Sequence, residues 1–90
     1  MGDDPILEQV KAIVTRIAGP TRAPARLDAD TLLGEGGLWL DSLDLFEAIL
    51  ACEEGFGVQI EAEADATAEA LRTVQGLADL IRATPRREPT

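Results

Sequence analysis

A loop passes into an amphipathic helix at Gly37-Leu38-Trp39-Leu40-Asp41-Ser42-Leu43-Asp44-Leu45-Phe46-Glu47-Ala48-Ile49-Leu50. Asp41 is a favourable N-cap residue, because its carboxylate can accept a hydrogen bond from the backbone N–H of Asp44. Asp44 can return this bond in part, although a capping box prefers Glu or Gln there. We therefore expect a helix that starts after Asp41, holds Ser42 in its first turn and continues to about Glu54.

Two faces can be assigned to this helix from its period of 3.6 residues. The face expected in the core contains Leu45, Ala48, Ile49 and Cys52, and the face expected in water contains Asp44, Glu47, Ala51 and Glu54. Leu43 and Leu50 lie on the border between the two. The acidic face is either simply solvated, or it is a docking surface where carboxylates attract basic partners and the two leucines supply apolar anchors.

Amphipathic helices are also predicted near both ends of the chain. Asp4 can cap a helix whose first residue is Pro5, and Gly19-Pro20 ends it. Thr73 can cap a last helix, in which Gly76 costs about 1 kcal/mol relative to Ala. Their apolar residues recur at three- and four-residue spacing, as Ile6, Leu7, Val10, Ile13, Val14 and Ile17 in the first and Val74, Leu77, Ala78, Leu80 and Ile81 in the last.

The connection over residues 19–41 is long, and Pro24 keeps it irregular. Residues 30–33 are predicted to make a short turn of helix. Glycines at 34, 36 and 37 allow sharp turns before Asp41. They do not form a nucleotide-binding loop, because the Lys-Ser/Thr ending and a preceding strand are missing. Five leucines are expected to hold the connection against the core: Leu27, Leu32, Leu33, Leu38 and Leu40.

After the central helix the sequence predicts one more short element. Gly55-Phe56-Gly57 ends the central helix with a glycine, and Phe56, Val58 and Ile60 return to the core. A short helix is expected around residues 66–71. The chain is thus predicted to be all-α, a small four-helix bundle with three main helices and one short helix. The helical domain is expected over residues 1–84, with a disordered tail over residues 85–90.

The amino-acid composition limits the classes of function that are expected. Eight Lys and Arg residues against 17 Asp and Glu residues give a net charge of −9, which disfavours nucleic acid and favours basic protein surfaces as partners. Histidine, the residue that most often performs general acid–base catalysis, is absent, so we do not expect an enzyme. The single Cys52 cannot close an intramolecular disulfide and is expected to be buried. With no signal peptide, myristoylation motif or membrane span, a cytoplasmic monomer is expected.

The segment Leu40-Asp41-Ser42-Leu43-Asp44 resembles the attachment motif of the acyl carrier protein family. The resemblance extends over roughly residues 5–83, through the first helix, the Leu- and Gly-bearing loop, the exit at residues 53–60 and the closing helix at residues 73–81. It implies the helical fold of that family and a phosphopantetheine arm joined to Ser42 by a phosphodiester, whose thiol carries acyl groups as thioesters. On this resemblance the cofactor-binding residues are Ser42 and Asp41, and the partner-binding residues are Leu43, Asp44, Glu47, Leu50 and Glu54.

The resemblance also implies the partners and the chemistry. A phosphopantetheinyl transferase would attach the arm and supply the metal and the base, because this chain has no histidine to activate the Ser42 hydroxyl. Acyl-transferring, ketosynthase-type or acyl-activating enzymes with basic docking patches would then use the carrier in fatty acid, polyketide or related biosynthesis. The start of a helix favours a phosphate ester at Ser42. The acyl group is expected either to swing out to a partner or to shelter against Leu45, Ile49, Val58, Ile60 and Leu71.

Three departures from the family pattern affect these expectations. Trp39 replaces a common glycine, and we expect it to pack under the loop, the alternative being contact with the arm or a partner. Phe46 is larger and Ala48 smaller than usual, which suggests a reshaped cavity. The segment before the third helix is a few residues longer than common.

Other classes of function stay open at this point. One is a peptidyl or aryl carrier loaded with an amino or aromatic acid. Another is an unmodified acidic module for protein interaction, in which Ser42 is only structural. A carboxylate enzyme or metal-binding protein is the third, although the acidic residues lack the dense spacing of a calcium loop.

Overall fold

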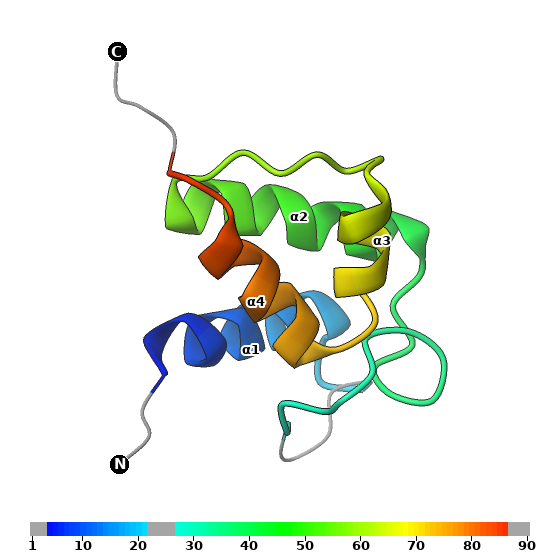
Figure 1. Cartoon of the computed structure of the whole chain (residues 1–90). Helices are drawn as coiled ribbons and strands as arrows, with labels where there is room; N and C mark the ends of the chain where they lie inside the picture. Colours follow the sequence, from blue (N-terminus) through cyan, green and yellow to red (C-terminus); the bar gives the residue numbers. More distant parts are fainter. Residues whose placement is uncertain (1–3, 22–26, 87–90) are drawn as a thin grey trace.

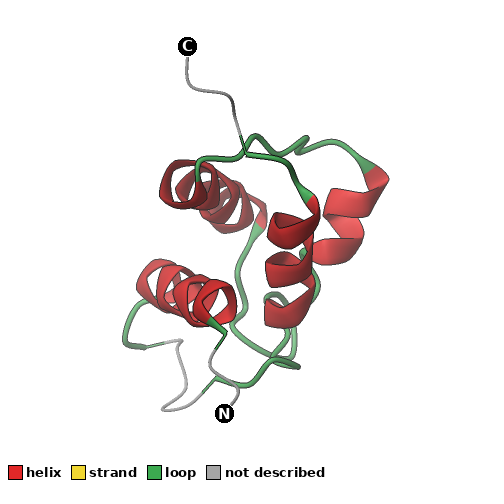
Figure 2. Ribbon diagram, turned by 60° about the vertical axis from the view of Figure 1, so that its left-hand side comes forward, coloured by secondary structure: helices red, strands yellow, loops and turns green. Residues whose placement is uncertain are grey.

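The computed structural model describes residues 4–21 and 27–86 of the 90-residue chain. It contains four helices in the order α1 (Pro5–Ala18), α2 (Ser42–Phe56), α3 (Asp65–Ala70) and α4 (Val74–Ala83). α1 packs against α2 and α4, and α3 packs against α4 (Figure 1). Figure 2 shows α1 and α2 on one side of the bundle and α3 and α4 on the other. The predicted all-α bundle of three main helices and one short helix is confirmed.

The predicted caps of α1 and α4 are confirmed. The carboxylate of Asp4 accepts a hydrogen bond from the backbone N–H of Leu7, with Pro5 as the first helical residue. The hydroxyl of Thr73 accepts one from the N–H of Gly76 at 2.9 Å. α1 ends at Gly19, whose φ of 80° is unfavourable for other residues. These caps fix where α1 and α4 begin. The two helices pack against each other and supply much of the buried core.

The packing of α3 against α4 explains why a glycine is found at position 76, inside a helix. A Cβ atom at this position would lie 2.6 Å from the carbonyl oxygen of Ala70, closer than side chains approach. The glycine therefore allows the end of α3 to meet the first turn of α4. Close packing of the two helices offsets its unfavourable helix propensity.

The loop before α2 differs from the prediction at Leu32. Leu33, Leu38 and Leu40 are buried as expected and Leu27 is partly buried, but Leu32 is 40% exposed. The turn lies at residues 28–31 rather than 30–33, and Leu32 forms an isolated β-bridge with Thr73. An extended backbone here lets the loop bond the α3–α4 connection, and this turns the Leu32 side chain outward. The predicted irregularity at Pro24 lies outside the described residues.

α2 continues two residues beyond the predicted end, to Phe56. Gly57 then takes a left-handed conformation with φ 67°, and its N–H donates to the carbonyl of Glu53. The carboxylate of Glu53 also accepts from the N–H of Ile60 at 2.8 Å, which holds the following segment against the helix. Within the predicted tail, Arg86 forms an isolated β-bridge with Val58, and residues 87–90 lie outside the described part.

Candidate functional site

Ser42 lies at the first residue of α2, on the surface. It is the only serine in the chain. The capping box around it is complete, because the N–H of Asp44 donates to Asp41 Oδ1 at 2.8 Å and the N–H of Asp41 donates to Asp44 Oδ2 at 3.2 Å. The reciprocal bonds predicted from the sequence are thus present. They fix the helix start and leave the Ser42 hydroxyl outside the core.

Backbone hydrogen bonds stabilise the loop that precedes Ser42. The N–H of Leu38 donates to the carbonyl of Leu32, and the N–H of Leu40 donates to the carbonyl of Leu33, both at 2.9 Å. Gly37 lies inside this turn, where a Cβ atom would be 1.9 Å from the carbonyl oxygen of Leu32. Only glycine fits this position, so the sharp turn expected from the glycines is anchored at Gly37.

Trp39 faces away from the core. Its neighbours Leu38 and Leu40 are buried, and the alternation leaves Trp39 59% exposed with a left-handed φ of 59°. The prediction that Trp39 packs under the loop is therefore wrong. The reason is that Leu38 and Leu40, one on each side of Trp39, already fill the space under the loop.

The outer face of α2 is more apolar than the sequence indicated. Leu43 is 68% exposed and Leu50 is 48% exposed, and Phe46 is 47% exposed between them. Phe46 follows Leu45 by one residue, so a rotation of about 100° turns it to solvent. Phe46 therefore does not reshape an interior cavity as expected, whereas Ala48 does lie in the core.

The rest of α2 follows the predicted faces with two exceptions. Ile49 and Cys52 are buried with Ala48, but Leu45 is only half-buried. Ala51, assigned to the water face, packs against the core instead. α1 lies alongside α2 and covers this part of its surface.

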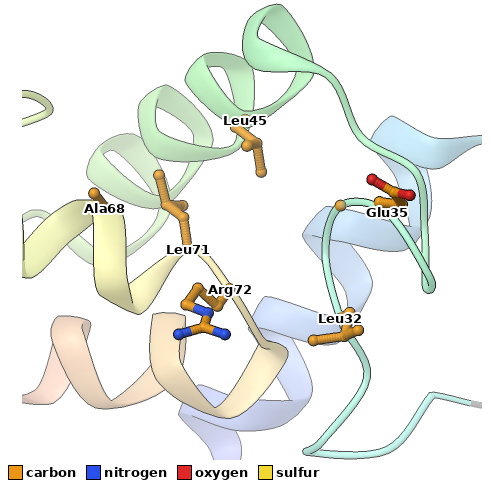
Figure 3. Close-up of a pocket in the computed structure, with 7 residues that line it drawn as sticks. Leu32, Glu35, Leu45, Ala68, Leu71 and Arg72 are labelled. Carbon is orange, nitrogen blue, oxygen red and sulfur yellow. The ribbon is translucent and has the colours of Figure 1, made fainter.

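A groove of about 480 Å³ opens beside Leu45 (Figure 3), which follows Ser42 by three residues in α2. Its lining comes from α2, α3, the α3–α4 connection and the loop before α2, and consists of Leu32, Gly34, Glu35, Leu45, Ala68, Leu71 and Arg72. Of the five residues expected to shelter an acyl group, Leu45 and Leu71 line this groove. The other three, Ile49, Val58 and Ile60, are buried in the core.

Negative charge dominates the sequence around this site. Residues 27–71 contain twelve Asp and Glu residues and no Lys or Arg. Arg72 is the cation at the groove, and it forms an ion pair with Glu69 at 3.0 Å. The predicted partner-binding carboxylates Glu47 and Glu54 are exposed, and Asp44 is half-buried. A protein that approaches Ser42 therefore meets an acidic surface.

Cys52 is buried in the core, as predicted. Burial raises the pKa of its thiol from 9.0 to about 12, and the nearby Glu53 carboxylate adds to the shift. Because the folded-state pKa exceeds the unfolded value, stability linked to this thiol is present below pH 9.0 and is lost as the pH rises toward 12. The thiol is therefore protonated and unreactive near neutral pH.

We expect a thiol reagent to distinguish Cys52 from any thiol added to the surface. At pH 8 the native, unmodified protein should release almost no coloured thiolate from an aromatic disulfide reagent. The denatured protein should release one equivalent. Rapid release of one equivalent from the native, unmodified chain would contradict the burial of Cys52.

The capping box carries a testable share of the stability. Replacing Asp41 with Ala is expected to lower the free energy of unfolding by about 1 kcal/mol, because the N–H of Asp44 loses its acceptor. Asp41→Asn keeps an oxygen acceptor and should lose only a few tenths of that amount. Urea denaturation followed by circular dichroism measures both. An Asp41→Ala variant as stable as the parent would mean that the cap does not hold the helix start.

Two kinds of site are absent from the described part of the chain. Within residues 4–21 and 27–86, no group of three or more His, Cys, Asp or Glu side chains is arranged to hold a metal ion. In the same ranges, no helix has both the length and the apolar character needed to cross a bilayer.

Comparison with known proteins finds relatives among the curated proteins. An acyl carrier protein from Thermosynechococcus vestitus is 42% identical to this chain over 81 residues, which is 90% of this chain and 93% of that protein. No family model matches the chain. No solved structure matches it. A match over all but nine of 90 residues must include α2 and Ser42.

Proposed function

The chain belongs to the acyl carrier protein family, and on that premise we propose that Ser42 is the residue to which a phosphopantetheine arm is attached. Proteins of this family are carriers rather than enzymes. The proposed carrier domain spans residues 1–84 and acts in the cytoplasm, in fatty acid, polyketide or related biosynthesis. The observation that supports this most strongly is the position of the sole serine, exposed at the capped start of α2 and one turn from a groove.

The residues at the start of α2 suit a phosphate ester. The N–H groups of Ser42 and Leu43 have no acceptor within the helix, and the positive end of the helix dipole favours negative charge there. The carboxylates of Asp41 and Asp44 are occupied by backbone N–H groups. The arrangement therefore holds Ser42 in place without using its own hydroxyl as the cap.

When bound, the arm supplies a thiol that forms thioesters with acyl groups. The chain's own contribution is to present the attachment oxygen and to keep reactive groups away from the cargo. It contains no histidine, and Cys52 is buried and protonated. Such a surface offers a thioester few nucleophiles, as a carrier requires.

The groove beyond Ser42 is the proposed shelter for a cargo. Leu45 from α2 and Leu71 after α3 face it, and Ala68 lies beside them (Figure 3). Apolar surface of this kind favours the burial of a hydrocarbon chain. Arg72 and Glu35 make the other parts of the lining polar. The groove is therefore apolar at Leu32, Leu45, Ala68 and Leu71, and polar at Glu35 and Arg72.

Intact mass spectrometry tests the proposed function. The protein is incubated with coenzyme A, Mg²⁺ and a broad-specificity phosphopantetheinyl transferase. We expect the mass to rise by one phosphopantetheine per chain, and the native protein to gain one rapidly reacting thiol. If the folded protein gains no mass with several such transferases, the carrier proposal fails, and an unmodified acidic interaction module becomes the better account.

A further inference from the structure

The chain has three aromatic residues, and two of them face solvent close to Ser42. Trp39 and Phe46 are exposed, whereas Phe56 packs against the core. With Leu43 and Leu50 the two exposed aromatic residues form a series spaced by four, three and four residues. We name this set, Trp39, Leu43, Phe46 and Leu50, the aromatic ridge.

The aromatic ridge lies within reach of any enzyme that acts on Ser42. A standard interface covers about 800 Å² of each partner, a patch about 16 Å in radius. Trp39 precedes Ser42 by three residues, so their Cα atoms are at most about 11 Å apart. Leu50 follows Ser42 by eight residues, about 12 Å along the helix axis. Both distances are shorter than this radius, so an enzyme centred on Ser42 can reach the whole ridge.

The backbone at Trp39 is held in an unusual conformation that exposes the indole. A positive φ is rare for bulky residues and involves backbone strain, yet Trp39 adopts 59° while its side chain is mostly in water. Both features are unfavourable in the isolated protein. A partner that covers the indole would remove apolar surface from water, which favours binding. Tryptophan is also enriched among the residues that contribute most to the affinity of interfaces.

The charges beside the ridge define the partner's chemistry. The carboxylates of Asp41, Glu47 and Glu54 are exposed on the same loop and helix, and residues 27–71 contain no cation. A complementary surface has an apolar centre and a rim of Lys and Arg side chains. Apolar anchors with a charged border are the usual anatomy of a specific interface.

The geometry points to Trp39 as a specificity-determining anchor for the enzymes that modify or unload this carrier. The partner surface would hold an apolar socket for Trp39 and Phe46, rimmed with Lys and Arg. This inference rests on the proposed function, because it takes Ser42 as the point to which partners are directed.

Binding is tested with the single tryptophan as a reporter. The protein is labelled with 5-fluorotryptophan and carries Ser42→Ala, so that docking is separated from modification. A phosphopantetheinyl transferase with coenzyme A is then added. We expect the single ¹⁹F resonance of Trp39 to shift or broaden on docking. An unchanged resonance at saturating transferase would overturn the inference.

Kinetics test whether the contact matters. In the chain with Ser42 intact, Trp39→Gly should lower kcat/KM for modification about tenfold or more, and Trp39→Phe should recover much of that loss. Gln59→Ala, an exposed change beyond the other end of α2, should leave kcat/KM unchanged. Circular dichroism checks that each variant is folded.

The outcomes separate this inference from the proposed function. If the parent is not modified at all, the proposed function itself fails. If the parent and Trp39→Gly are modified equally well, the ridge is not an anchor, although Ser42 remains the attachment site. If the ¹⁹F signal changes with the protein's own concentration and sedimentation shows a dimer, the ridge joins two copies instead and the inference is overturned.

Discussion

Replacing Ser42 with Ala is expected to abolish phosphopantetheine attachment while leaving the fold intact. No other serine can accept the arm, and Cys52 is buried. The side chain of Ser42 is exposed and the cap comes from Asp41, so the free energy of unfolding should change by no more than about 0.5 kcal/mol. Intact mass after the transferase reaction measures the first effect, and urea denaturation measures the second.

Thr15→Ala is the matched control for this loss. Thr15 also has an exposed side chain, on α1. The Thr15→Ala variant should gain one phosphopantetheine as the parent does. An adduct of the same mass on the Ser42→Ala variant would show that the arm is attached elsewhere, and the assignment of Ser42 would be wrong.

Replacing Gly37 with Ala is expected to destabilise the protein strongly. The added Cβ would lie 1.9 Å from the carbonyl oxygen of Leu32 and 2.7 Å from its carbonyl carbon. Both are backbone atoms that cannot rotate away, so the turn must open and the hydrogen bond from the N–H of Leu38 to Leu32 is lost. We expect the free energy of unfolding to fall by about 3 kcal/mol or more.

Gly34→Ala in the same loop provides the comparison. A Cβ atom at Gly34 meets only the carbonyl oxygen of Leu40, at an ordinary 3.9 Å. This variant should stay within about 0.5 kcal/mol of the parent in urea denaturation. Equal stability of the Gly34→Ala and Gly37→Ala variants would mean that the loop does not make the tight turn described here.

The helices were predictable from sequence because their ends are specified locally. Asp4, Asp41 and Thr73 each cap a helix through a hydrogen bond to a residue three positions later. Such signals depend only on neighbouring residues, and the apolar spacing then gives the buried face. The capping box at Ser42 was predictable for the same reason.

The loop and the outer face of α2 were harder to predict, because they depend on contacts between distant segments. Leu32 turns outward when the loop pairs with Thr73, and Trp39 turns outward because its two neighbours are buried. Ala51 is covered because α1 lies against α2. Apolar residue type alone did not reveal these placements.

The groove was predicted only in part for a related reason. The sequence offered several apolar residues near Ser42, and whether each one lines a cavity or fills the core depends on the packing of α3. Leu45 and Leu71 border the groove, while Ile49 is buried between the helices. Arg72 and Glu35 join the lining only because the loop and the α3–α4 connection meet there.

Peptide mapping after the transferase reaction shows directly which residue carries the arm. Trypsin should release Ser42 on one peptide, residues 27–72, because no Lys or Arg interrupts it. After the transferase reaction, fragmentation of this peptide should place one phosphopantetheine on Ser42. An adduct on Thr31, Thr67 or Cys52 would contradict the assignment of Ser42. So would an unmodified peptide from protein that was folded during the transferase reaction.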